Sequence, residues 1–576
     1  MKFIFKYLRP LVPSLCFGMT VKVLATLFEL ALPYILSHIL DRVVPTGEMA
    51  YIFGWGAAMI VAALLACIGN IIANRNAAGV ARDASRRIRH DLFEATMHLT
   101  ARETDRFTVP SLESRLTSDT YNVHHFIGMM QRIGVRAPIL LLGGMAITLV
   151  LDRRLALVLI ATLPLIGITV FAITFKGLPL YRENQRAVDG MVRVVREDCQ
   201  GVRVIKALSK EDFESRRYDA ANRNLVAREQ KAGVTMALSQ PLINLFLNLG
   251  LVAVIFVGAY FVNIDLSKPG RIIAFIQYFT LMSGAMTVIT RIFVQYTKSV
   301  ASANRISEVI DTAKAHDKGE PLTQTENTPV DDTRFIEFEG VSFSYNGRKN
   351  NLSDISFSLP RGGTLGIIGA TGSGKTTLTA LLMRFYDADS GEIRIGGKPL
   401  SYYDTATLRG MFGVVMQNDF ISADTVAENI RFGRTISEES IRRAARLAQA
   451  AEFIEAFEDG YEHALTAKGT NLSGGQRQRV LIARALAGDP EILILDDASS
   501  ALDYKTDANL RRAIREELHT TTVVIAQRVS SVMHADHILV LDHGRVIGAG
   551  THAQLMEQCS AYREISDSQM GGAFLE

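Results

Sequence analysis

Apolar runs separated by polar stretches fill the chain up to about residue 310. Six of these runs approach the ~20 residues that an α-helix needs to cross the hydrocarbon core of a bilayer. They cover residues 11–40, 51–73, 127–151, 155–175, 234–262 and 271–296. Arg132 and Arg136 interrupt the first part of the third run, which places its membrane portion at residues 137–151. The pattern predicts six membrane-spanning helices.

The stretches that follow the second and fourth runs are long and basic. Their cationic residues include Arg82, Arg86, Arg87, Arg89, Arg193, Arg203, Lys206, Arg216 and Arg217. The other loops are short, and only residues 152–154 are notably charged. Because lysine and arginine accumulate on the cytoplasmic side of membrane proteins, both termini and both long stretches are predicted to be cytoplasmic. These stretches contain few glycines or prolines, so the membrane helices are expected to continue into the cytosol.

The composition changes after residue 311. Residues 312–334 are polar, carry two prolines and show no periodic apolar pattern, which is typical of a linker. From Phe335 onward, strand-like segments such as FIEFEGVSFSY and ILILDD alternate with amphipathic helices, the pattern of an α/β domain. The predicted fold is multidomain: an all-α six-helix transmembrane domain (1–311), a linker (312–334) and an α/β P-loop domain (335–576).

A glycine-rich turn in TLGIIGATGSGKTTL joins a predicted strand, residues 364–368, to a predicted helix. Glycines let successive backbone N–H groups curl around phosphate oxygens, and the helix N-terminus adds its positive end. Lys375 is expected to reach the β- and γ-phosphates of ATP, and the Thr376 hydroxyl to coordinate Mg²⁺. The candidate nucleotide-binding residues of this turn are Gly369, Thr371, Gly372, Ser373, Gly374, Lys375, Thr376 and Thr377.

The stretch ILILDDASSALD, residues 492–503, begins as a buried strand and continues into two adjacent carboxylates. Four apolar residues in a row suit a central strand covered on both faces. An α/β sheet usually places its chemistry at the carboxyl ends of such strands. Asp496 is expected to hold Mg²⁺, and Asp497 to lie beside the water that attacks the γ-phosphate. Together with the glycine-rich turn, this stretch predicts a P-loop nucleotide hydrolase.

Between these motifs lies NLSGGQRQRV, residues 471–480, which leads into a helix with an apolar face. Ser473, Gly474, Gly475 and Gln476 stand at the start of that helix, where a hydroxyl and free backbone amides attract an anion. One P-loop domain holds one nucleotide. A second phosphate-binding surface therefore implies a γ-phosphate that another subunit presents.

Composition adds smaller constraints. A formal net charge of +3 over 576 residues is too small to indicate a nucleic-acid partner, and none is expected. The four cysteines (Cys16, Cys67, Cys199 and Cys559) lie far apart and are expected to be unpaired thiols. No cleavable signal peptide is expected, because the apolar stretch behind the basic N-terminus is too long and lacks a clear cleavage site.

In their order along the chain, these motifs resemble the half-size exporters of the ABC transporter family, and the likeness covers essentially the whole sequence. The resemblance implies that Tyr345 stacks on adenine and that Gln417 senses Mg²⁺ and meets the membrane domain. Asp503 closes the SALD string that resembles the D-loop, and GAGTHAQL, residues 548–555, matches the usual stretch near the C-terminus. FTVPSLESRLTSD and VRVIKALSKEDFESRRYD resemble the intracellular segments whose short coupling helices touch the ATP-binding domains.

Three features depart from the family pattern. Asp497 stands where a glutamate is usual, Gln527 stands where the switch histidine is usual, and residues 467–469 read Ala-Lys-Gly before the LSGGQ signature, residues 472–476. The Asp497 side chain is shorter than that of glutamate by one C–C bond, about 1.5 Å. Its carboxylate therefore falls short of the reach that a general base needs. Gln527 is neutral at every pH. The implied catalytic residues are Asp497, Gln527 and Gln417, and the implied metal ligands are Thr376, Gln417 and Asp496.

An impaired site beside an intact signature predicts a heterodimer. A second half-transporter would bring the missing glutamate and histidine, which would work against Ser473–Gln476 of this chain. The alternative is a homodimeric exporter that hydrolyses ATP slowly through Asp497. A non-transporting channel or regulator is a further alternative, whereas six membrane spans exclude a soluble ATPase of DNA repair or translation.

The cargo stays open at the level of sequence. Polar residues within the spans are costly in lipid and are expected to face a cavity or the partner: Lys22, Glu29, Asn244, Asn248, Gln277 and Arg291. Phe275, Phe279, Met282 and Met286 suit either an adaptable apolar pocket or ordinary helix packing. A small molecule, a lipid or a peptide remains possible, with multidrug or lipid-like cargo the commonest role of the family. The expected location is the bacterial plasma (inner) membrane, with the ATP-binding domain in the cytoplasm.

Overall fold

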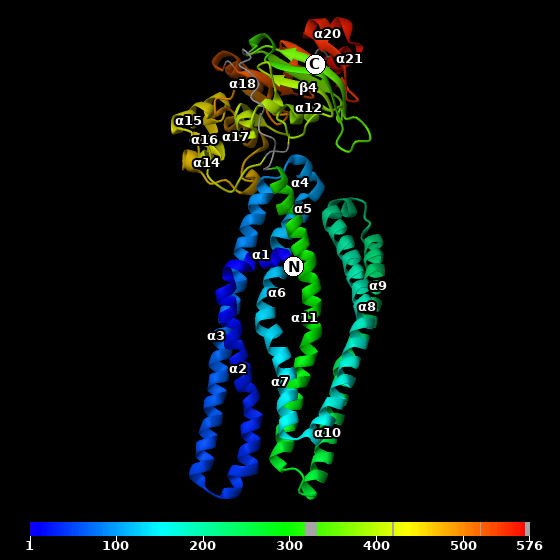
Figure 1. Cartoon of the computed structure of the whole chain (residues 1–576). Coiled ribbons are helices and arrows are strands. Elements are labelled where there is room, and N and C mark those ends of the chain that lie inside the picture. Colours follow the sequence, from blue (N-terminus) through cyan, green and yellow to red (C-terminus); the bar gives the residue numbers. More distant parts are fainter. Residues whose placement is uncertain (317–330, 418–419, 519, 571–576) are drawn as a thin grey trace. The chain divides into compact units, whose positions relative to one another are not determined.

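The structure is a computed structural model that describes residues 1–316, 331–417, 420–518 and 520–570 (Figure 1). The chain divides into two compact units, which are described separately. A helical unit comprises Met1–Leu99 and Thr108–Asp317, and an α/β unit comprises Thr100–Phe107 and Lys318–Glu576. Of the expected linker at residues 312–334, residues 317–330 lie outside the described part of the chain.

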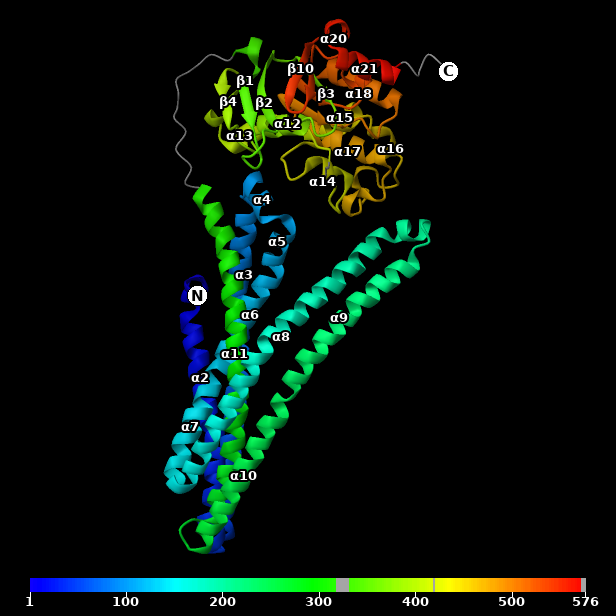
Figure 2. The same cartoon turned by 90° about the vertical axis from the view of Figure 1, so that its right-hand side faces the viewer.

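The helical unit is built from long helices joined by short turns. Its helices are α1 (Lys2–Leu8), α2 (Val12–His38), α3 (Met49–Met97), α5 (Val109–Ser114), α6 (Thr120–Met129), α7 (Val135–Leu151), α8 (Arg153–Ala207), α9 (Glu211–Ala237), α10 (Ser239–Asn263) and α11 (Pro269–His316). Figure 2 shows α8 and α9 side by side, leaning away from the other helices of this unit. The long basic stretches are thus helical, as the sequence predicts.

Five segments of the described chain are long and apolar enough to cross a membrane, judged by length and composition. They are Lys2–Thr46, Met49–Met97, Val109–Leu151, Arg153–Ala207 and Glu211–Asn263. Each contains one of the first five spans predicted from the sequence. The sixth predicted span falls within α11, which is helical from Pro269 to His316.

Several polar side chains of the spans find partners inside the helical unit, and several apolar ones are buried in its core. Lys22 is only 4% exposed and donates to the Asn70 side chain at 2.6 Å, so the expectation that it faces a cavity or the partner is wrong. Glu29 forms an ion pair with Arg136. Phe275, Phe279 and Met282 belong to the buried core, which supports the helix-packing alternative for them.

The described cysteines are unpaired, which confirms the prediction made from their spacing. Cys16, Cys67 and Cys199 are exposed and Cys559 is buried.

Two sheets organise the α/β unit. An antiparallel sheet has the order β2-β1-β4-β5, and a six-stranded sheet has the order β10-β9-β3-β8-β7-β6. The strands are β1 (Ile336–Phe343), β2 (Leu352–Leu359), β3 (Thr364–Gly369), β4 (Ser390–Ile395), β5 (Lys398–Pro399), β6 (Phe412–Val415), β7 (Ile492–Asp496), β8 (Thr521–Ile525), β9 (His537–Asp542) and β10 (Arg545–Gly550). Strands β6, β7, β8, β3 and β9 pair in parallel.

The helices of this unit connect the strands and pack around the sheets. They are α4 (Ala101–Phe107), α12 (Lys375–Leu382), α13 (Thr405–Gly410), α14 (Val426–Arg431), α15 (Glu438–Leu447), α16 (Ala451–Glu455), α17 (Gly474–Leu486), α18 (Tyr504–Glu517), α19 (Val529–Val532), α20 (His552–Gln558) and α21 (Ser560–Met570). All five residues of β7 are buried, as its continuous apolar run predicts. Parallel pairing brings the carboxyl ends of β3, β7 and β8 to one edge, where the candidate site lies.

Candidate nucleotide-binding site

The glycine-rich turn follows β3 and opens α12, as its sequence predicts. Gly369 leaves no room for a side chain, because a Cβ there would lie 2.1 Å from the Leu541 carbonyl oxygen. Gly374 is the N-cap of α12 and has φ +105°, a conformation that residues with a Cβ rarely adopt. These two glycines fix the turn so that the N-terminus of α12 points at the space above the sheet edge.

Lys375 and Ser373 both offer polar groups to an anion at this turn. The Lys375 ammonium donates to the carbonyl oxygens of Gly369 and Ala370, each at 2.9 Å, so it folds back over the turn. Burial lowers the pKa of Lys375, while Asp496 and Asp497 act in the opposite direction. The Ser373 side-chain oxygen is buried without a hydrogen-bond partner among the described residues. A phosphate would satisfy both groups, so the turn fits ATP.

Thr376 and Asp496 form a pair of oxygen donors beside the turn. The Thr376 hydroxyl donates to Asp496 Oδ2 at 3.0 Å, and Asp496 is 5% exposed at the end of β7. Burial raises the pKa of Asp496, and the hydrogen bond from Thr376 partly offsets that rise. A hydroxyl and a carboxylate are the hard oxygen ligands that Mg²⁺ prefers, so this donor set fits the expected ion.

Asp497 occupies a strained backbone position next to Asp496. Its φ is +54°, which is uncommon for a residue other than glycine, and its backbone N–H donates to the Ile525 carbonyl at 2.9 Å. Burial raises the pKa of its carboxyl group, opposed by the positive charges of Lys375 and Arg528. The strand pairing thus holds the Asp497 backbone in place, and the short side chain must work from there.

A cleft of about 230 Å³ brings most of the predicted residues together. The predicted residues that line it are Thr371, Gly372, Gly374, Lys375, Thr376, Thr377, Gln417, Asp496, Asp497 and Gln527. They come from the glycine-rich turn, from the loop after β6, and from the ends of β7 and β8. Residues more than 150 positions apart in the sequence therefore share one cleft, at the sheet edge that the strand pattern predicts.

Tyr345 lies beside this group and does not line the cleft. Its hydroxyl donates to Thr377 Oγ1 at 3.2 Å, and its ring packs edge-on against Phe343 and Tyr386, at 4.9 and 5.1 Å between centroids. The residue as a whole remains 42% exposed, which leaves a surface on which a base can stack.

The signature residues also lie outside the cleft. Ser473 caps α17: its hydroxyl accepts from Gln476 N at 3.2 Å, and Gln476 Oε1 accepts from Ser473 N at 2.9 Å. Gly475 passes close to the D-loop, where an added Cβ would lie 3.1 Å from the Ala501 carbonyl. Asp503 caps α18 by accepting from Thr506, and these bonds lower the pKa of Asp503.

Two residues near the site carry no motif and were not predicted from the sequence. Asn351 lines the cleft and accepts a hydrogen bond from the Tyr345 backbone at 3.2 Å. Gln569 of α21 brackets the switch position: it donates to the Gln527 carbonyl at 2.9 Å and accepts from Val529 N at 2.8 Å. Both reach the site through tertiary contacts, so no local pattern in the sequence identifies them.

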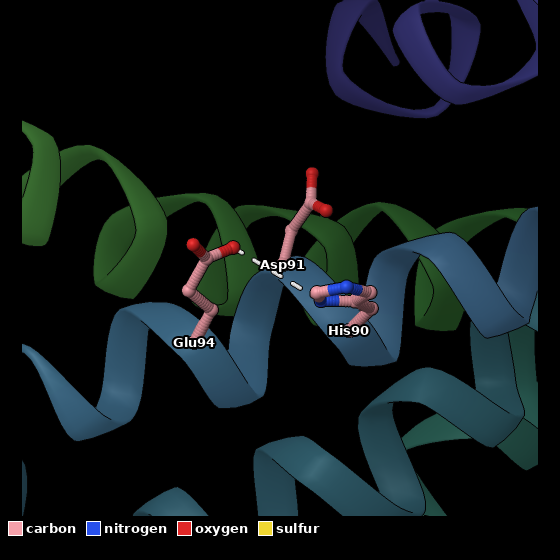
Figure 3. A group of neighbouring side chains, drawn as sticks. All are labelled: His90, Asp91 and Glu94. Atoms are coloured by element: carbon pink, nitrogen blue, oxygen red, sulfur yellow. Dashed lines mark ion pairs between the residues drawn. The ribbon is translucent and has the colours of Figure 1, made fainter.

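The helical unit carries a small group of metal-ligating residue types on α3. Figure 3 shows His90, Asp91 and Glu94 along one stretch of this helix, with an ion pair between His90 and Glu94 at 4.0 Å. Asp91 points away from that pair and accepts a hydrogen bond from the Tyr7 hydroxyl at 2.7 Å. These contacts explain why the three side chains lie together on α3 without a metal ion.

Comparisons with known proteins agree with this architecture. The ABC transporter transmembrane region model matches residues 15–286, and the ABC transporter model matches residues 352–500. An uncharacterized ABC transporter ATP-binding protein of Bacillus subtilis, YfiB, is 34% identical over 545 residues, which cover 94% of each chain. The ATP-dependent lipid A-core flippase of Vibrio cholerae is 32% identical over 489 residues, 84% of this chain and 83% of the flippase.

The fold also resembles that of a solved exporter. The structure of a bacterial Atm1-family ABC exporter with ATP bound superposes with a TM-score of 0.77 at 24% sequence identity, and the match covers 96% of this chain and 98% of the other. The two family models thus match both the membrane and the ATP-binding parts of the chain, and relatives above 30% identity extend over most of its length. The chain belongs to the ABC transporter family, as a half-size exporter of the inner membrane that couples ATP hydrolysis to transport.

Proposed function

We propose that this chain is the degenerate-site half of a heterodimeric exporter. One observation carries the proposal: two of the departures from the family pattern, Asp497 and Gln527, lie in the same cleft, while the LSGGQ signature is complete and lies outside that cleft. Asp497 and Gln527 both line the cleft, whereas Ser473 caps its own helix elsewhere. In such a heterodimer, one site holds ATP, and a second site, completed by the partner, hydrolyses ATP.

The chain's own site should bind ATP well. Lys375 would leave the carbonyl oxygens of the turn and bind the β- and γ-phosphates, while Ser373 and the N-terminus of α12 donate to phosphate oxygens. Thr376 and Asp496 would hold Mg²⁺, with Gln417 as the third proposed ligand. Bound Mg²⁺ neutralises charge on the phosphates. Tyr345 would stack on the adenine through its exposed ring face.

Hydrolysis at this site should be slow. Asp497 would have to place a water in line with the γ-phosphate, and its carboxylate falls about one C–C bond, ~1.5 Å, short of the reach of glutamate. The pairing of Asp497 N with Ile525 O resists a backbone shift that would close this gap. Gln527 offers an amide in place of a titratable imidazole. The site would therefore stabilise a closed dimer by retaining ATP.

The signature points to a partner. Ser473 caps α17, a 13-residue helix that begins at Gly474. Its capping box uses the N–H groups of Ser473 and Gln476, so the N–H groups of Gly474 and Gly475 are the ones proposed to face an anion. The chain's own cleft contains none of these residues. We propose that they bind the γ-phosphate of ATP held by the partner, whose glutamate and histidine would complete a site that hydrolyses ATP efficiently.

Copurification with the product of the neighbouring transporter gene tests the heterodimer. The chain should elute as a 1:1 complex with that product, retain ATP through gel filtration, and hydrolyse ATP only when the partner has its Walker B glutamate, the counterpart of Asp497. A stable dimer of this chain alone with full ATPase activity would support the homodimeric alternative. A partner that itself carries Asp-Asp and a switch glutamine would contradict the asymmetric arrangement.

For the substrate, we propose a chemical class. The similarity to a lipid A-core flippase makes amphipathic lipids the first compounds to test, followed by drugs and peptides. Transport into inside-out vesicles that contain the complex is the direct assay, because export then concentrates the substrate in the vesicle lumen.

A further inference from the structure

A cavity separate from the nucleotide cleft lies in the α/β unit between α18, α19 and the face of β8. Its volume is about 500 Å³, within the usual range for small-molecule sites. Strand β8 lies between β3 and β7, and a strand in this position is normally covered on both faces. Val524 of β8 is nevertheless only partly buried and lines the cavity. The helices on this face therefore leave part of the central sheet open; we call this opening the α18–α19 cavity.

The α18–α19 cavity is lined by apolar, hydroxyl-bearing and basic side chains; the hydroxyls are those of Thr364, Thr520, Thr522 and Ser531. Leu495, Ile514, Val524 and Ala535 supply apolar side chains from β7, α18, β8 and the segment after α19. The ionisable residues that line it are Arg361, Arg511, Arg515, His534 and Asp332. Three arginines against one aspartate make this lining cationic before His534 is counted. Apolar side chains beside several cationic ones match a ligand that has an apolar body and an anionic group, and the hydroxyl groups can add hydrogen bonds to it.

The three arginines differ in how far their charge is neutralised. Arg361 forms ion pairs with Asp332 and Glu491, at 2.7 and 2.9 Å. Arg511 pairs with Asp507 at 2.6 Å. Arg515 donates to the His534 carbonyl at 3.3 Å, and no carboxylate among the described residues lies within ion-pair distance of it. Among these three arginines, Arg515 is thus the one whose charge no ion pair within the described residues neutralises.

The walls of the cavity connect directly to the D-loop and to the switch position of the nucleotide site. Helix α18 begins at its cap Asp503, the D-loop residue, and α19 begins two residues after Gln527. Arg511 ties the two helices together by donating to the Ser530 carbonyl. Ser531, which lines the cavity, lies 3.4 Å from Ser499, just after Asp497. A ligand between α18 and α19 would therefore act on the D-loop and on the switch position at once.

We propose that the α18–α19 cavity is a regulatory site for a small amphipathic organic anion, whose anionic group pairs with Arg515 and whose apolar body covers Val524. Such a ligand would set the spacing of α18 and α19. Because these helices begin at the D-loop and beside the switch, occupancy would change the affinity of the nucleotide site for ATP. Linkage requires ATP to change the affinity for the anion by the same factor.

Titration calorimetry on the full chain in lipid nanodiscs tests this site, with naphthalene-2-sulfonate as the probe and empty nanodiscs as the blank. We expect one saturable site, and affinity for uncharged naphthalene-2-sulfonamide lower by about tenfold or more, equivalent to ~1.4 kcal/mol. Arg515→Glu should weaken sulfonate binding by a similar factor. Arg512→Glu is the matched control: Arg512 is exposed on the same helix, contacts Asn509 and does not line the cavity.

Further measurements test the anion site and its regulatory role separately. Arg515→Gln, a milder change, should reproduce the loss if Arg515→Glu disturbs folding, and unchanged ATP binding would show that each variant is folded. Saturating ATP should shift the affinity for the probe by about fivefold or more. An absence of saturable binding, equal losses in the Arg512 and Arg515 variants, or equal binding of the sulfonamide would overturn the anion site. Probe binding that ignores ATP would overturn its regulatory role.

Discussion

The Tyr386 hydroxyl donates a hydrogen bond to Asp105 at 2.5 Å, while the Tyr386 ring packs edge-on against Tyr345 at 5.1 Å between centroids. Asp105 lies on α4, a seven-residue helix that belongs to the α/β unit although the chain on both sides of it belongs to the helical unit. Burial, followed by the contact with Asp105, raises the pKa of Tyr386 above its ordinary value, so the phenol stays protonated as a donor. One side chain thus links α4 to the aromatic residue expected to stack on adenine.

Removing this hydroxyl should weaken coupling without removing ATP binding. A hydrogen bond to a charged group contributes ~1.5–3 kcal/mol, which corresponds to roughly tenfold or more in the occupancy of the contact. We expect Tyr386→Phe to reduce vesicle transport by about tenfold while ATP affinity changes less than about twofold, because the ring remains against Tyr345. Tyr402→Phe is the control, since within the described ranges the Tyr402 hydroxyl accepts only a long hydrogen bond, from Lys398 at 3.4 Å. Equal losses in both variants would contradict a specific role for the α4 contact.

The sequence predicted the cleft better than it predicted this link. The glycine-rich turn and the pair Asp496–Asp497 are local patterns whose backbone chemistry demands particular residues, and both lie where expected. The quoted FTVPSLESRLTSD segment begins at Phe107, the last residue of α4, so the helix that joins the α/β unit lies just before it. Tyr386 and Gln569 act through tertiary contacts between distant segments. Such contacts leave no periodicity or spacing in the sequence, so only the structure reveals them.

Restoring the usual residues should activate the chain's own site. Asp497→Glu adds the missing methylene, and a positioned general base contributes about 10²–10⁴-fold to a rate. We expect at least about a tenfold rise in hydrolysis, and a further rise when Gln527→His is added. The assay uses a complex whose partner lacks its own Walker B glutamate, so that only this site contributes. Asp497→Asn should change little, because the native site is already slow; a large loss on this substitution would show that Asp497 is an effective base.

The signature should act on the partner's nucleotide. Ser473→Ala removes a donor to the γ-phosphate and also a helix cap that is worth ~1 kcal/mol. We expect ATPase activity of the complex to fall roughly 100-fold, as when one preorganised donor is lost from a catalytic site. Thr551→Ala is the matched control, because Thr551 and Gln554 form the same capping box on α20, away from the cleft. If both variants lose activity equally, the effect is one of helix stability.

The buried carboxylates should make ATP binding depend on pH. Burial raises the pKa of both Asp496 and Asp497, so each holds a proton at a pH where an ordinary carboxyl group is ionised. A protonated carboxyl group is a poor Mg²⁺ ligand. Affinity for ATP with Mg²⁺ should therefore fall on acidification, beginning at a higher pH than an ordinary aspartate would give. With EDTA the same protonation removes negative charge facing the phosphates, so affinity should hold or rise.

A variant isolates this effect from the titration of ATP itself. Asp496→Asn cannot lose or gain the proton, so its ATP affinity with Mg²⁺ should be lower at neutral pH and should vary less with pH than that of the native chain. Fluorescence titration with an ATP analogue over a range of pH values measures both profiles. Parallel profiles for the two proteins would show that Asp496 does not control the dependence.

Gln569 should matter most once the switch position is repaired. It bonds the Gln527 carbonyl and Val529 N, two contacts that each contribute ~1 kcal/mol, and so holds the backbone on both sides of Arg528. An imidazole at position 527 must sit within hydrogen-bond reach of the γ-phosphate, which requires that backbone to stay in place. We therefore expect Gln569→Ala to cancel most of the gain from Gln527→His in the Asp497→Glu background, with little effect in the native chain. Gln558→Ala, an exposed glutamine on α20, should leave the gain intact. A gain that survives Gln569→Ala would mean that the sheet alone positions the switch.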